Sequence, residues 1–301
     1  MTESPLTRCG FIAIVGAPNV GKSTLLNRMV GTKVSIVSPK VQTTRARVLG
    51  ILVEGPAQLI FIDTPGIFAP RRRLDRAMVA AAWGGADHAD LVMVLVDAAK
   101  GVDGDTRSII GRLKKSDRRA LLVLNKVDLV QKPILLDRAA ALNREDIFTD
   151  TFMLCATTGD GVGDFVAHLS AILPEGPWLF PEDQLSDMPE RLLAAEITRE
   201  KLYLELHQEL PYQATVETEG WSERDDGSVR IDQVIFVERS SQKGIVLGKG
   251  GQRIKSMGEA SRRELEEILA RRVHLFLFVK VRQNWGDDPE RYRDWGLDFT
   301  A

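Results

Sequence analysis

The sequence has only two cysteines, Cys9 and Cys155, among its 301 residues. They are too few and too far apart along the chain to indicate a disulfide or zinc framework, and such sparse use is typical of a reducing cytoplasm. The apolar runs have the length of strands and fall far short of the roughly 20 residues that a membrane-spanning helix needs. The polar stretch over residues 1–8 has no signal-peptide pattern. We therefore expect a cytoplasmic protein without a membrane span.

Neither sign of charge dominates the composition. The chain has 40 basic and 42 acidic side chains, for a net charge of -2. This balance excludes a polycation, so any contact with nucleic acid must use a local patch. With 44% hydrophobic residues the chain is not intrinsically disordered. The composition is that of a soluble globular protein, and the length suggests about two domains.

Short apolar runs alternate with longer mixed stretches from Gly10 to about Leu173. The runs are continuously apolar, which indicates strands buried on both faces, and the stretches between them have the apolar spacing of three and four that is typical of helices. We expect strands over residues 11–15, 59–62, 91–96, 121–124 and 151–154, and helices over residues 22–30, 74–82 and 106–113. The alternation predicts an α/β domain, a three-layer α/β/α arrangement around a mainly parallel sheet.

Residues 16–23 read Gly-Ala-Pro-Asn-Val-Gly-Lys-Ser and fit the phosphate-binding pattern G-x-x-x-x-G-K-S/T. The segment stands where this pattern requires, after a predicted strand and at the start of a predicted helix. In such a loop the backbone N–H groups and the helix N-terminus face the phosphates, Lys22 reaches the β and γ oxygens, and Ser23 ligates magnesium. A tight turn without a ligand is the alternative, and the context favours the nucleotide site.

Two further segments follow predicted strands and indicate which nucleotide binds. In Asp63-Thr-Pro-Gly66 the carboxylate points toward the magnesium, and Gly66 offers an N–H to the γ-phosphate. In Asn125-Lys-Val-Asp128 the last carboxylate can accept hydrogen bonds from guanine N1–H and its exocyclic amine, while Asn125 and the stem of Lys126 brace the base. Adenine lacks these donors and would leave the acceptors unpaired. The segments therefore predict a guanine nucleotide.

Three other features concern the switch and the hydrolysis step. A main-chain N–H around Ala156, after the next predicted strand, is expected to meet guanine O6. Thr43 and Thr44 are both candidates for the threonine that closes over magnesium and the γ-phosphate, with Thr44 preferred and both left open by the sequence. Ile67 follows Gly66, and its apolar side chain cannot polarise a water molecule. Hydrolysis is then expected to be slow and to depend on another group, a bound ion or a partner.

The order and spacing of these segments resemble the translation-factor-related class of small GTPases over residues 8–173. The resemblance implies GTP and GDP as ligands together with Mg²⁺. Asn19 resembles the asparagine with which potassium-activated relatives hold K⁺. The candidate catalytic residues are Lys22, Thr44 and Gly66, and the candidate metal ligands are Ser23, Thr44 and Asp63. The candidate nucleotide-binding residues are Gly16, Asn19, Val20, Gly21, Lys22, Ser23, Thr24, Asp63, Gly66, Asn125, Lys126, Asp128 and Ala156.

A proline-rich stretch over residues 174–189 predicts a linker, and the pattern changes after it. We expect a helix over residues 191–207, strands over 214–219 and 230–237, two helices across 252–272 and a last strand over 273–281. This α-β-β-α-α-β order predicts an α+β domain over residues 190–285. A tail over residues 286–301 follows, whose aromatic side chains are expected to pack on the last strand rather than to stack on bases.

Basic side chains gather around Gly248-Lys-Gly-Gly251, with nine of them and only four glutamates over residues 239–272. The loop is expected to follow a strand and to precede a helix, with Ile254 turned to the core. This pattern resembles a type II KH domain, which implies that the loop clamps the backbone of about four single-stranded nucleotides while the bases lie in an apolar groove. The candidate RNA-binding residues are Gly248, Lys249, Gly250, Gly251, Arg253 and Lys255.

The two domains in this order resemble the Era family of bacterial GTPases over essentially the whole chain. The resemblance implies a GTP-controlled protein of 30S ribosomal subunit assembly that binds near the 3′ end of 16S ribosomal RNA. It also implies peripheral association with the inner membrane, although the sequence has no lipidation motif. We expect a monomer. Two alternatives remain open, an ATP-dependent enzyme with the same phosphate loop and a GTPase whose C-terminal domain contacts protein or membrane.

Overall fold

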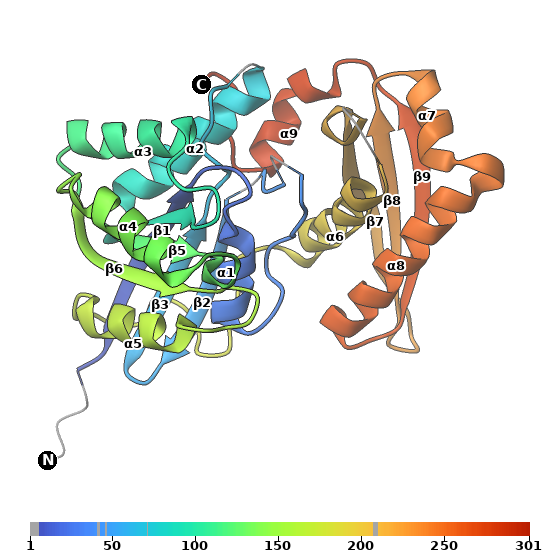
Figure 1. Ribbon diagram of the computed structural model, residues 1–301. Helices are drawn as coiled ribbons and strands as arrows, with labels where there is room; N and C mark the ends of the chain where they lie inside the picture. The colour runs from blue at the N-terminus through green and yellow to red at the C-terminus, as the bar shows by residue number, and fades with distance from the viewer. Residues whose placement is uncertain (1–5, 41–42, 46, 71, 207–209) are drawn as a thin grey trace, which may run out of the picture. The chain divides into compact units, whose positions relative to one another are not determined.

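The computed structural model describes residues 6–40, 43–45, 47–70, 72–206 and 210–301. The chain forms two compact units: the first contains residues up to 35, 44–187 and 292–301, and the second contains residues 36–43 and 188–291. None of the helices in the described ranges has the length and apolarity to cross a bilayer. The labels of Figure 1 are used for the elements below.

The first unit is built around a six-stranded sheet with the strand order β2-β3-β1-β4-β5-β6 (Figure 1). All neighbouring strands are parallel except β2, which is antiparallel to β3. The strands are β1 (Arg8–Gly16), β2 (Val48–Glu54), β3 (Ala57–Asp63), β4 (Leu91–Asp97), β5 (Ala120–Asn125) and β6 (Phe148–Leu154). The helices are α1 (Lys22–Val30), α2 (Arg73–His88), α3 (Gly104–Lys115), α4 (Lys132–Asn143) and α5 (Val162–Ile172), with a 3₁₀ turn η1 (Val127–Leu129).

Both faces of this sheet are covered by helices, as the continuously apolar strands predict. Helices α2, α3 and α4 bury Trp83, Ile109 and Leu142 against one face, and α1 and α5 bury Leu25 and Phe165 against the other. All seven residues of β3 are buried. The predicted three-layer α/β/α domain is therefore confirmed, and its strands end at one edge of the sheet, where polar side chains from several motifs meet.

All five predicted strands and all three predicted helices are present, but β2, α4 and α5 were not predicted. Strand β2 is interrupted by Gly50, which makes its apolar run look broken. The glycine serves packing, because a Cβ on Gly50 would lie 2.4 Å from Leu26 Cδ1 of helix α1. Only the packed structure shows that this glycine belongs inside a strand.

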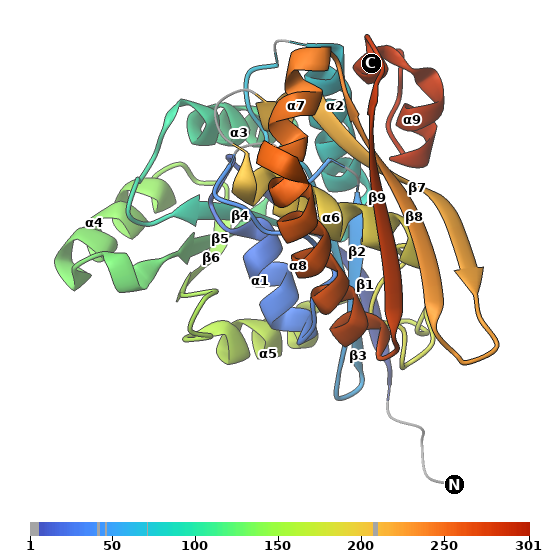
Figure 2. The same cartoon turned by 90° about the vertical axis from the view of Figure 1, so that its right-hand side faces the viewer.

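The second unit consists of a three-stranded sheet, order β7-β8-β9, with helices along one face (Figures 1 and 2). Strand β8 is antiparallel to β7 and parallel to β9. The main elements are α6 (Glu190–Glu205), β7 (Ala214–Glu223), β8 (Val229–Val237), α7 (Ser240–Leu247), α8 (Gln252–Leu269) and β9 (Val273–Val281), and the short ones are η2 (Leu210–Gln213), η3 (Lys249–Gly251), η4 (Trp285–Asp287) and α9 (Pro289–Asp294). This is the predicted α-β-β-α-α-β order of an α+β domain.

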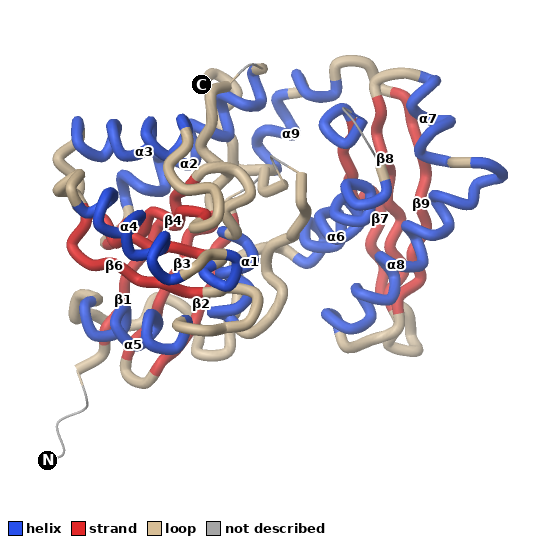
Figure 3. Tube along the Cα trace, in the orientation of Figure 1, coloured by secondary structure: helices blue, strands red, loops and turns tan. Residues whose placement is uncertain are grey.

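The placement of the two central helices corrects the prediction (Figure 3). Two helices were expected after the glycine loop, but α7 precedes the loop and α8 alone follows it. The apolar, β-branched end of α7 resembles a strand in sequence. The structure instead shows a helix here. Gln242 Oε1 caps its start by accepting a hydrogen bond from the Arg239 N–H at 2.9 Å, and Val246 is fully buried in the core. The glycine loop therefore joins two helices.

The predicted linker packs on the first unit over residues 174–187. The side-chain oxygen of Gln58, in β3, accepts hydrogen bonds from the N–H groups of Leu179 and Phe180 at 2.8 and 3.0 Å. The side chain of Phe180 packs against the apolar core of the same unit. This stretch therefore has fixed partners along its length.

The aromatic residues at the C-terminal end, from Trp285 onward, are divided between the two units. Trp285 is buried in the second unit, and its indole N–H donates to the Gln213 carbonyl at 3.1 Å. Tyr292 and Phe299 form an edge-to-face pair in the first unit with ring centroids 5.0 Å apart, and Trp295 lies near Arg45 there. The prediction of packing on the last strand is wrong for the residues after 291, which belong to the other unit.

Candidate nucleotide site and RNA interface

The phosphate-binding loop connects β1 to α1, and two close approaches explain its glycines. Gly21 precedes α1 with a φ of 101°, and a Cβ there would lie 2.4 Å from Asn125 Nδ2. A Cβ on Gly16 would lie 2.6 Å from the Leu95 carbonyl oxygen. A side chain at either position would displace the backbone, so both glycines of the motif are needed for the shape of the loop.

Lys22 lies at the base of this loop with its side chain buried. Its Nζ donates hydrogen bonds to the carbonyl oxygens of Gly16 and Ala17 at 3.1 and 3.0 Å. Burial lowers the pKa of the Lys22 ammonium to about 8, against the opposing influence of the nearby Asp63 carboxylate. A desolvated ammonium held by the loop itself is well placed to bind the terminal phosphates of a nucleotide.

The lowered pKa of Lys22 predicts that nucleotide affinity falls as the pH rises. Contact with phosphate favours the protonated amine and raises its pKa in the complex, so binding takes up a proton at pH values above about 8. The affinity for a GTP analogue should then fall toward a limit of about tenfold per pH unit. Calorimetry near pH 8.5 in two buffers of different ionisation enthalpy measures the uptake, and near pH 7 it should be small. Equal binding heats in both buffers at the higher pH would contradict this assignment.

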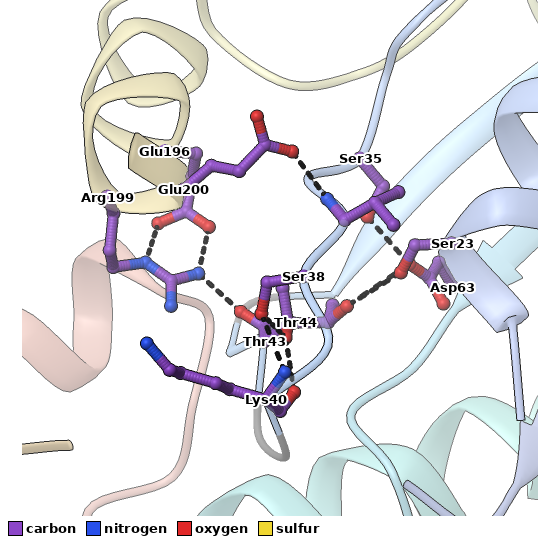
Figure 4. A network of polar contacts seen from close by, with 11 residues as sticks. Ser23, Ser35, Ser38, Lys40, Thr43, Thr44, Asp63, Glu196, Arg199 and Glu200 are labelled. Carbon is purple, nitrogen blue, oxygen red and sulfur yellow. Dashed lines mark hydrogen bonds and ion pairs between the residues drawn. The ribbon is translucent and has the colours of Figure 1, made fainter. Parts of the chain in front are cut away.

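Ser23, Thr44 and Asp63 form a compact cluster of oxygen atoms (Figure 4). Ser23 Oγ lies 2.8 Å from Asp63 Oδ2 and 3.0 Å from Thr44 Oγ1, which is itself 3.4 Å from the same carboxylate oxygen. Burial raises the pKa of the Asp63 carboxyl, although Lys22 and its hydrogen bonds oppose the shift. The other oxygen, Oδ1, is buried and accepts no hydrogen bond from the described residues. This oxygen-donor set fits Mg²⁺, the hard cation that the sequence analysis placed here.

The structure separates the two threonines between which the sequence could not choose. Thr43 Oγ1 donates to the Lys40 carbonyl at 2.7 Å and lies 2.7 Å from Ser38 Oγ. Thr44 instead joins the oxygen cluster. Ser35 also joins it, since its hydroxyl donates to Asp63 Oδ2 at 2.8 Å. Sequence reasoning missed Ser35, because no motif marks a serine at that distance from the aspartate.

The expected guanine-binding segments are tied to the phosphate loop by Asn125. Its Nδ2 donates to the Val20 carbonyl at 2.8 Å, and its Oδ1 accepts from the Ala156 N–H at 3.0 Å. Because the Ala156 N–H already donates to Asn125, the predicted contact with guanine O6 requires that this N–H be shared between the two oxygen atoms. Asp128 is exposed in η1. Its carboxylate is accessible to a base stacked in this region.

Lys126 supplies a second tie between the same segments. Its Nζ donates to the Asn19 carbonyl at 2.8 Å and pairs with Asp97 Oδ2 at 2.7 Å. Burial of Asp97 opposes ionisation, but hydrogen bonds from Lys126 and main-chain N–H groups outweigh it and lower the pKa of this carboxyl. Arg28 Nε donates to the Ala156 carbonyl at 3.1 Å. Sequence reasoning missed Asp97 and Arg28, because both act on neighbouring chain segments and stand in no motif.

The residue after the Asp63–Gly66 segment faces away from solvent. Ile67 is buried in the core, and its N–H donates to the Gly16 carbonyl at 3.1 Å. A Cβ on Gly66 would lie 3.0 Å from Pro18 Cα, so the backbone at this position runs directly against the phosphate loop. The Gly66 backbone is thus close to where a γ-phosphate would bind, while Ile67 offers no group that could orient water.

In the second unit the loop Gly248-Lys249-Gly250-Gly251 lies between α7 and α8. Gly248 has a φ of 72°, and a Cβ on it would lie 2.8 Å from Arg253 Cβ. Lys249 and Gly250 are exposed at the tip. The loop therefore presents backbone and a lysine ammonium to solvent, as a phosphate-backbone clamp requires.

The basic side chains near this loop differ from those farther along α8 in their ion pairs. Within the described part of the chain, Lys249 and Lys255 have no acidic partner within ion-pair distance. Arg262 and Arg263 pair with glutamates one turn away on α8, at 2.8 and 3.1 Å. Positive charge is thus compensated on the helix and uncompensated beside the loop, which favours an anionic partner at the loop.

A groove of about 480 Å³ runs between α8 and β9, next to the loop. Gly258 helps to form it, because a Cβ there would come within 3.4 Å of Leu277 Cδ1. Ile254 lines the groove and also packs against the core, as predicted. The remaining lining residues are Lys255, Glu259, Arg262, Leu275, Phe276 and Leu277. A mostly apolar wall beside unpaired cations matches the groove in which the sequence analysis placed nucleotide bases.

A phosphate loop, a buried oxygen cluster suited to Mg²⁺ and an Asn-Lys-x-Asp segment at one sheet edge define a P-loop GTPase, which this chain joins to a KH-like unit. Comparison with known families agrees. Residues 11–126 match the family model of a 50S ribosome-binding GTPase, and residues 209–286 match that of a KH domain. The chain belongs to the Era family of GTPases and is a GTP-hydrolysing enzyme.

Relatives in this family align with nearly the whole chain. GTPase Era of Rhizobium meliloti (strain 1021) is 63% identical over 293 residues, which cover 97% of this chain and 94% of that protein. GTPase Era of Brucella suis biovar 1 (strain 1330) is 60% identical over 300 residues, covering 100% and 96%. An Era variant of Aquifex aeolicus, crystallised with GDP·AlF₄⁻, is 39% identical with a TM-score of 0.91, covering 96% of this chain and 99% of that one.

Proposed function

We propose that this chain is a GTP-controlled switch that binds single-stranded 16S ribosomal RNA near its 3′ end and acts in assembly of the 30S subunit. The observation that carries the proposal is the uncompensated positive charge of the glycine loop beside an apolar groove. An Era crystallised with MgGDPNP and nucleotides 1506–1542 of 16S ribosomal RNA supports this partner; it is 39% identical to the chain and has a TM-score of 0.91. We further assign the GTPase domain to residues 8–173, the linker to 174–189 and the RNA-binding domain to 190–285.

At the nucleotide site we propose in-line attack of water on the γ-phosphate of GTP, which yields GDP and phosphate. Lys22 offsets the charge that develops on the phosphate oxygens, and the Gly66 N–H donates to one of them. Ser23, Thr44 and Asp63 would hold Mg²⁺, which neutralises phosphate charge when bound. Asn19, with a positive φ of 63° at the loop, would hold K⁺ in the same region. Asp128 selects guanine.

A loop variant tests the RNA interface without altering the nucleotide site. Replacing Lys249 and Gly250 together with aspartate puts negative charge at the exposed tip, where a side chain on Gly250 meets no atom within 4 Å. Affinity for a single-stranded RNA from the 3′ end of 16S ribosomal RNA should fall at least tenfold, roughly the cost of one or two lost contacts at about 1–3 kcal/mol each. Binding is measured with GTP analogue present, across a salt series.

The matched control is Arg224→Asp combined with Gly227→Asp. It makes the same charge change at the exposed turn between β7 and β8, and Gly227 also has a positive φ and open surroundings. The control should bind RNA within about twofold of the unaltered protein, because it lies outside the loop and groove. If the loop variant binds RNA as well as the control does, the second unit contacts protein or membrane instead of RNA.

A further inference from the structure

Residues 36–40 and 43, called the segment below, lie between two parts of the first unit in sequence but pack in the second unit. Ile36 is only 2% exposed. It belongs to an apolar cluster with Ala194 and Ile197 of helix α6 and Val229 of β8. The segment enters the core of the RNA-binding unit one residue after Ser35 and leaves it one residue before Thr44.

Helix α6 holds the main chain of this segment by charged side chains (Figure 4). Glu200 Oε1 accepts a hydrogen bond from the Val37 N–H at 2.7 Å. Arg199 Nη2 donates to the Thr43 carbonyl at 2.5 Å, and the same guanidinium pairs with Glu196 on the preceding turn, Nε to Oε1 at 2.8 Å. Because these bonds go to backbone groups, they fix the path of the chain rather than one side chain.

A side chain of the segment also binds main-chain groups at the end of α6. Lys40 Nζ donates to the carbonyl oxygens of Tyr203 and Leu206 at the C-terminal end of the helix. A cation is favoured there, because the last carbonyls of a helix lack partners within the helix and carry its negative dipole end. The described part of the segment is thus bonded to α6 at Val37, Lys40 and Thr43.

The flanking residues of the segment take part in the nucleotide site. Ser35 and Thr44 each donate to Asp63 Oδ2, at 2.8 and 3.4 Å. In the proposed switch, these groups rearrange when Mg²⁺ and the γ-phosphate bind. Any shift of Ser35 or Thr44 therefore pulls on the Glu200 and Arg199 bonds within one or two residues of chain.

Helix α6 is in turn linked to the RNA-binding helix α8. Glu200 Oε2 pairs with Lys201 at 2.8 Å, and the same ammonium pairs with Glu264 of α8. Ser256, beside the groove residue Lys255, donates to Glu205 of α6 at 2.9 Å. A continuous set of polar contacts therefore leads from residue 37 through α6 to the helix that begins at the glycine loop.

We propose that α6 transmits the nucleotide state to the RNA interface, with Arg199 and Glu200 as positioning residues that hold the segment at Val37 and Thr43. This inference rests on the proposed function, since it assigns the coupling of GTP and RNA to these contacts. Coupling is reciprocal: if GTP strengthens RNA binding by a given factor, RNA strengthens GTP binding by the same factor. Loss of the α6 contacts should remove both effects together.

The test measures the ratio of RNA affinities with GTP analogue and with GDP, using the full chain and single-stranded RNA from the 3′ end of 16S ribosomal RNA. In the unaltered protein we expect a ratio in the usual range of about 5–150. In Glu200→Ala the ratio should fall to within about twofold of one, and RNA should no longer strengthen GTP-analogue binding. RNA binding in the GDP state should change less than about twofold, because the loop and groove are unaltered.

Two comparisons distinguish coupling from stability. Glu190→Ala removes a glutamate from the same helix, where it pairs with Arg271 near the surface, and should keep the full ratio. The double variant Glu196→Gln with Arg199→Met removes the bond to Thr43 while leaving no unpaired buried charge. In this double variant the ratio of RNA affinities should fall as it does in Glu200→Ala. Thermal unfolding shows which variants stay folded.

The role of α6 and the proposed switch predict different results. If the unaltered protein has a ratio well above one and both α6 variants keep it, α6 does not carry the coupling. If the unaltered protein binds no RNA, or binds it equally in both nucleotide states, the proposed switch itself is wrong. Loss of the ratio in both α6 variants, with Glu190→Ala unaffected, establishes the inference.

Discussion

Replacing Lys22 with alanine is expected to abolish tight GTP binding. The Lys22 ammonium is buried at the base of the phosphate loop and is bonded to the loop carbonyls of Gly16 and Ala17. Removing it leaves the β- and γ-phosphates without this cation in a desolvated site, a loss of about 2–5 kcal/mol for a buried charge contact. This corresponds to roughly 30-fold to several thousandfold in affinity.

Equilibrium titration with a fluorescent GTP analogue measures the loss. The fold should survive, because the substitution removes a desolvated charge and no core side chain, so thermal unfolding without nucleotide should change little. Lys115→Ala, at the exposed C-terminal end of α3, is the matched control and should bind GTP normally. Near-normal affinity of the Lys22 variant would exclude residues 16–23 as the phosphate site.

Replacing Asp128 with asparagine should change the preferred base from guanine to xanthine. Guanine presents two donors to the Asp128 carboxylate, its N1–H and its exocyclic amine. In the variant the NH₂ group of the asparagine side chain faces one of these donors, and two donors cannot form a hydrogen bond. Xanthine carries a carbonyl in place of that amine and accepts the new hydrogen bond. GTP affinity should fall at least about a hundredfold, since polar groups that become buried when the base binds are left unpaired. The exposed position of Asp128 in η1 means that the fold does not depend on its carboxylate.

Competition of GTP and xanthosine triphosphate for the same site measures this change. Asp137→Asn is the matched control, since Asp137 is exposed on the neighbouring helix α4 and should keep its preference for GTP. An unchanged preference in the Asp128 variant would show that another group reads the base. Equal loss of GTP and ATP would instead indicate a site that never selected guanine.

Most of the nucleotide site could be predicted from the sequence, because its parts are short and local. The phosphate loop needs glycines at fixed spacing, and Lys22 and Ser23 start the helix that follows. Asp63 and Asn125 each end a buried strand, so a parallel sheet necessarily brings them to the same edge. The order of these segments along the chain was enough to place the domain in a GTPase class.

Residues that act on distant segments could not be predicted in this way. Ser35 bonds to Asp63, Arg28 bonds to the loop at Ala156, and Asp97 pairs with Lys126. Each contact joins segments whose separation in sequence carries no spacing rule. Helix α7 was missed for a related reason, because its apolar end fits a strand as well as a helix until Val246 is buried against the sheet.

The sequence by itself determined the two domain types, the guanine-nucleotide motifs and the glycine loop with its basic neighbours. Only the tertiary structure placed Thr44 rather than Thr43 beside Ser23, and placed residues 36–40 and 43 in the second unit and residues after 291 in the first. The physical reason is that motifs depend on backbone geometry over a few residues. The unit into which a polar loop packs depends instead on charged partners such as Arg199 and Glu200, which lie more than 150 residues away.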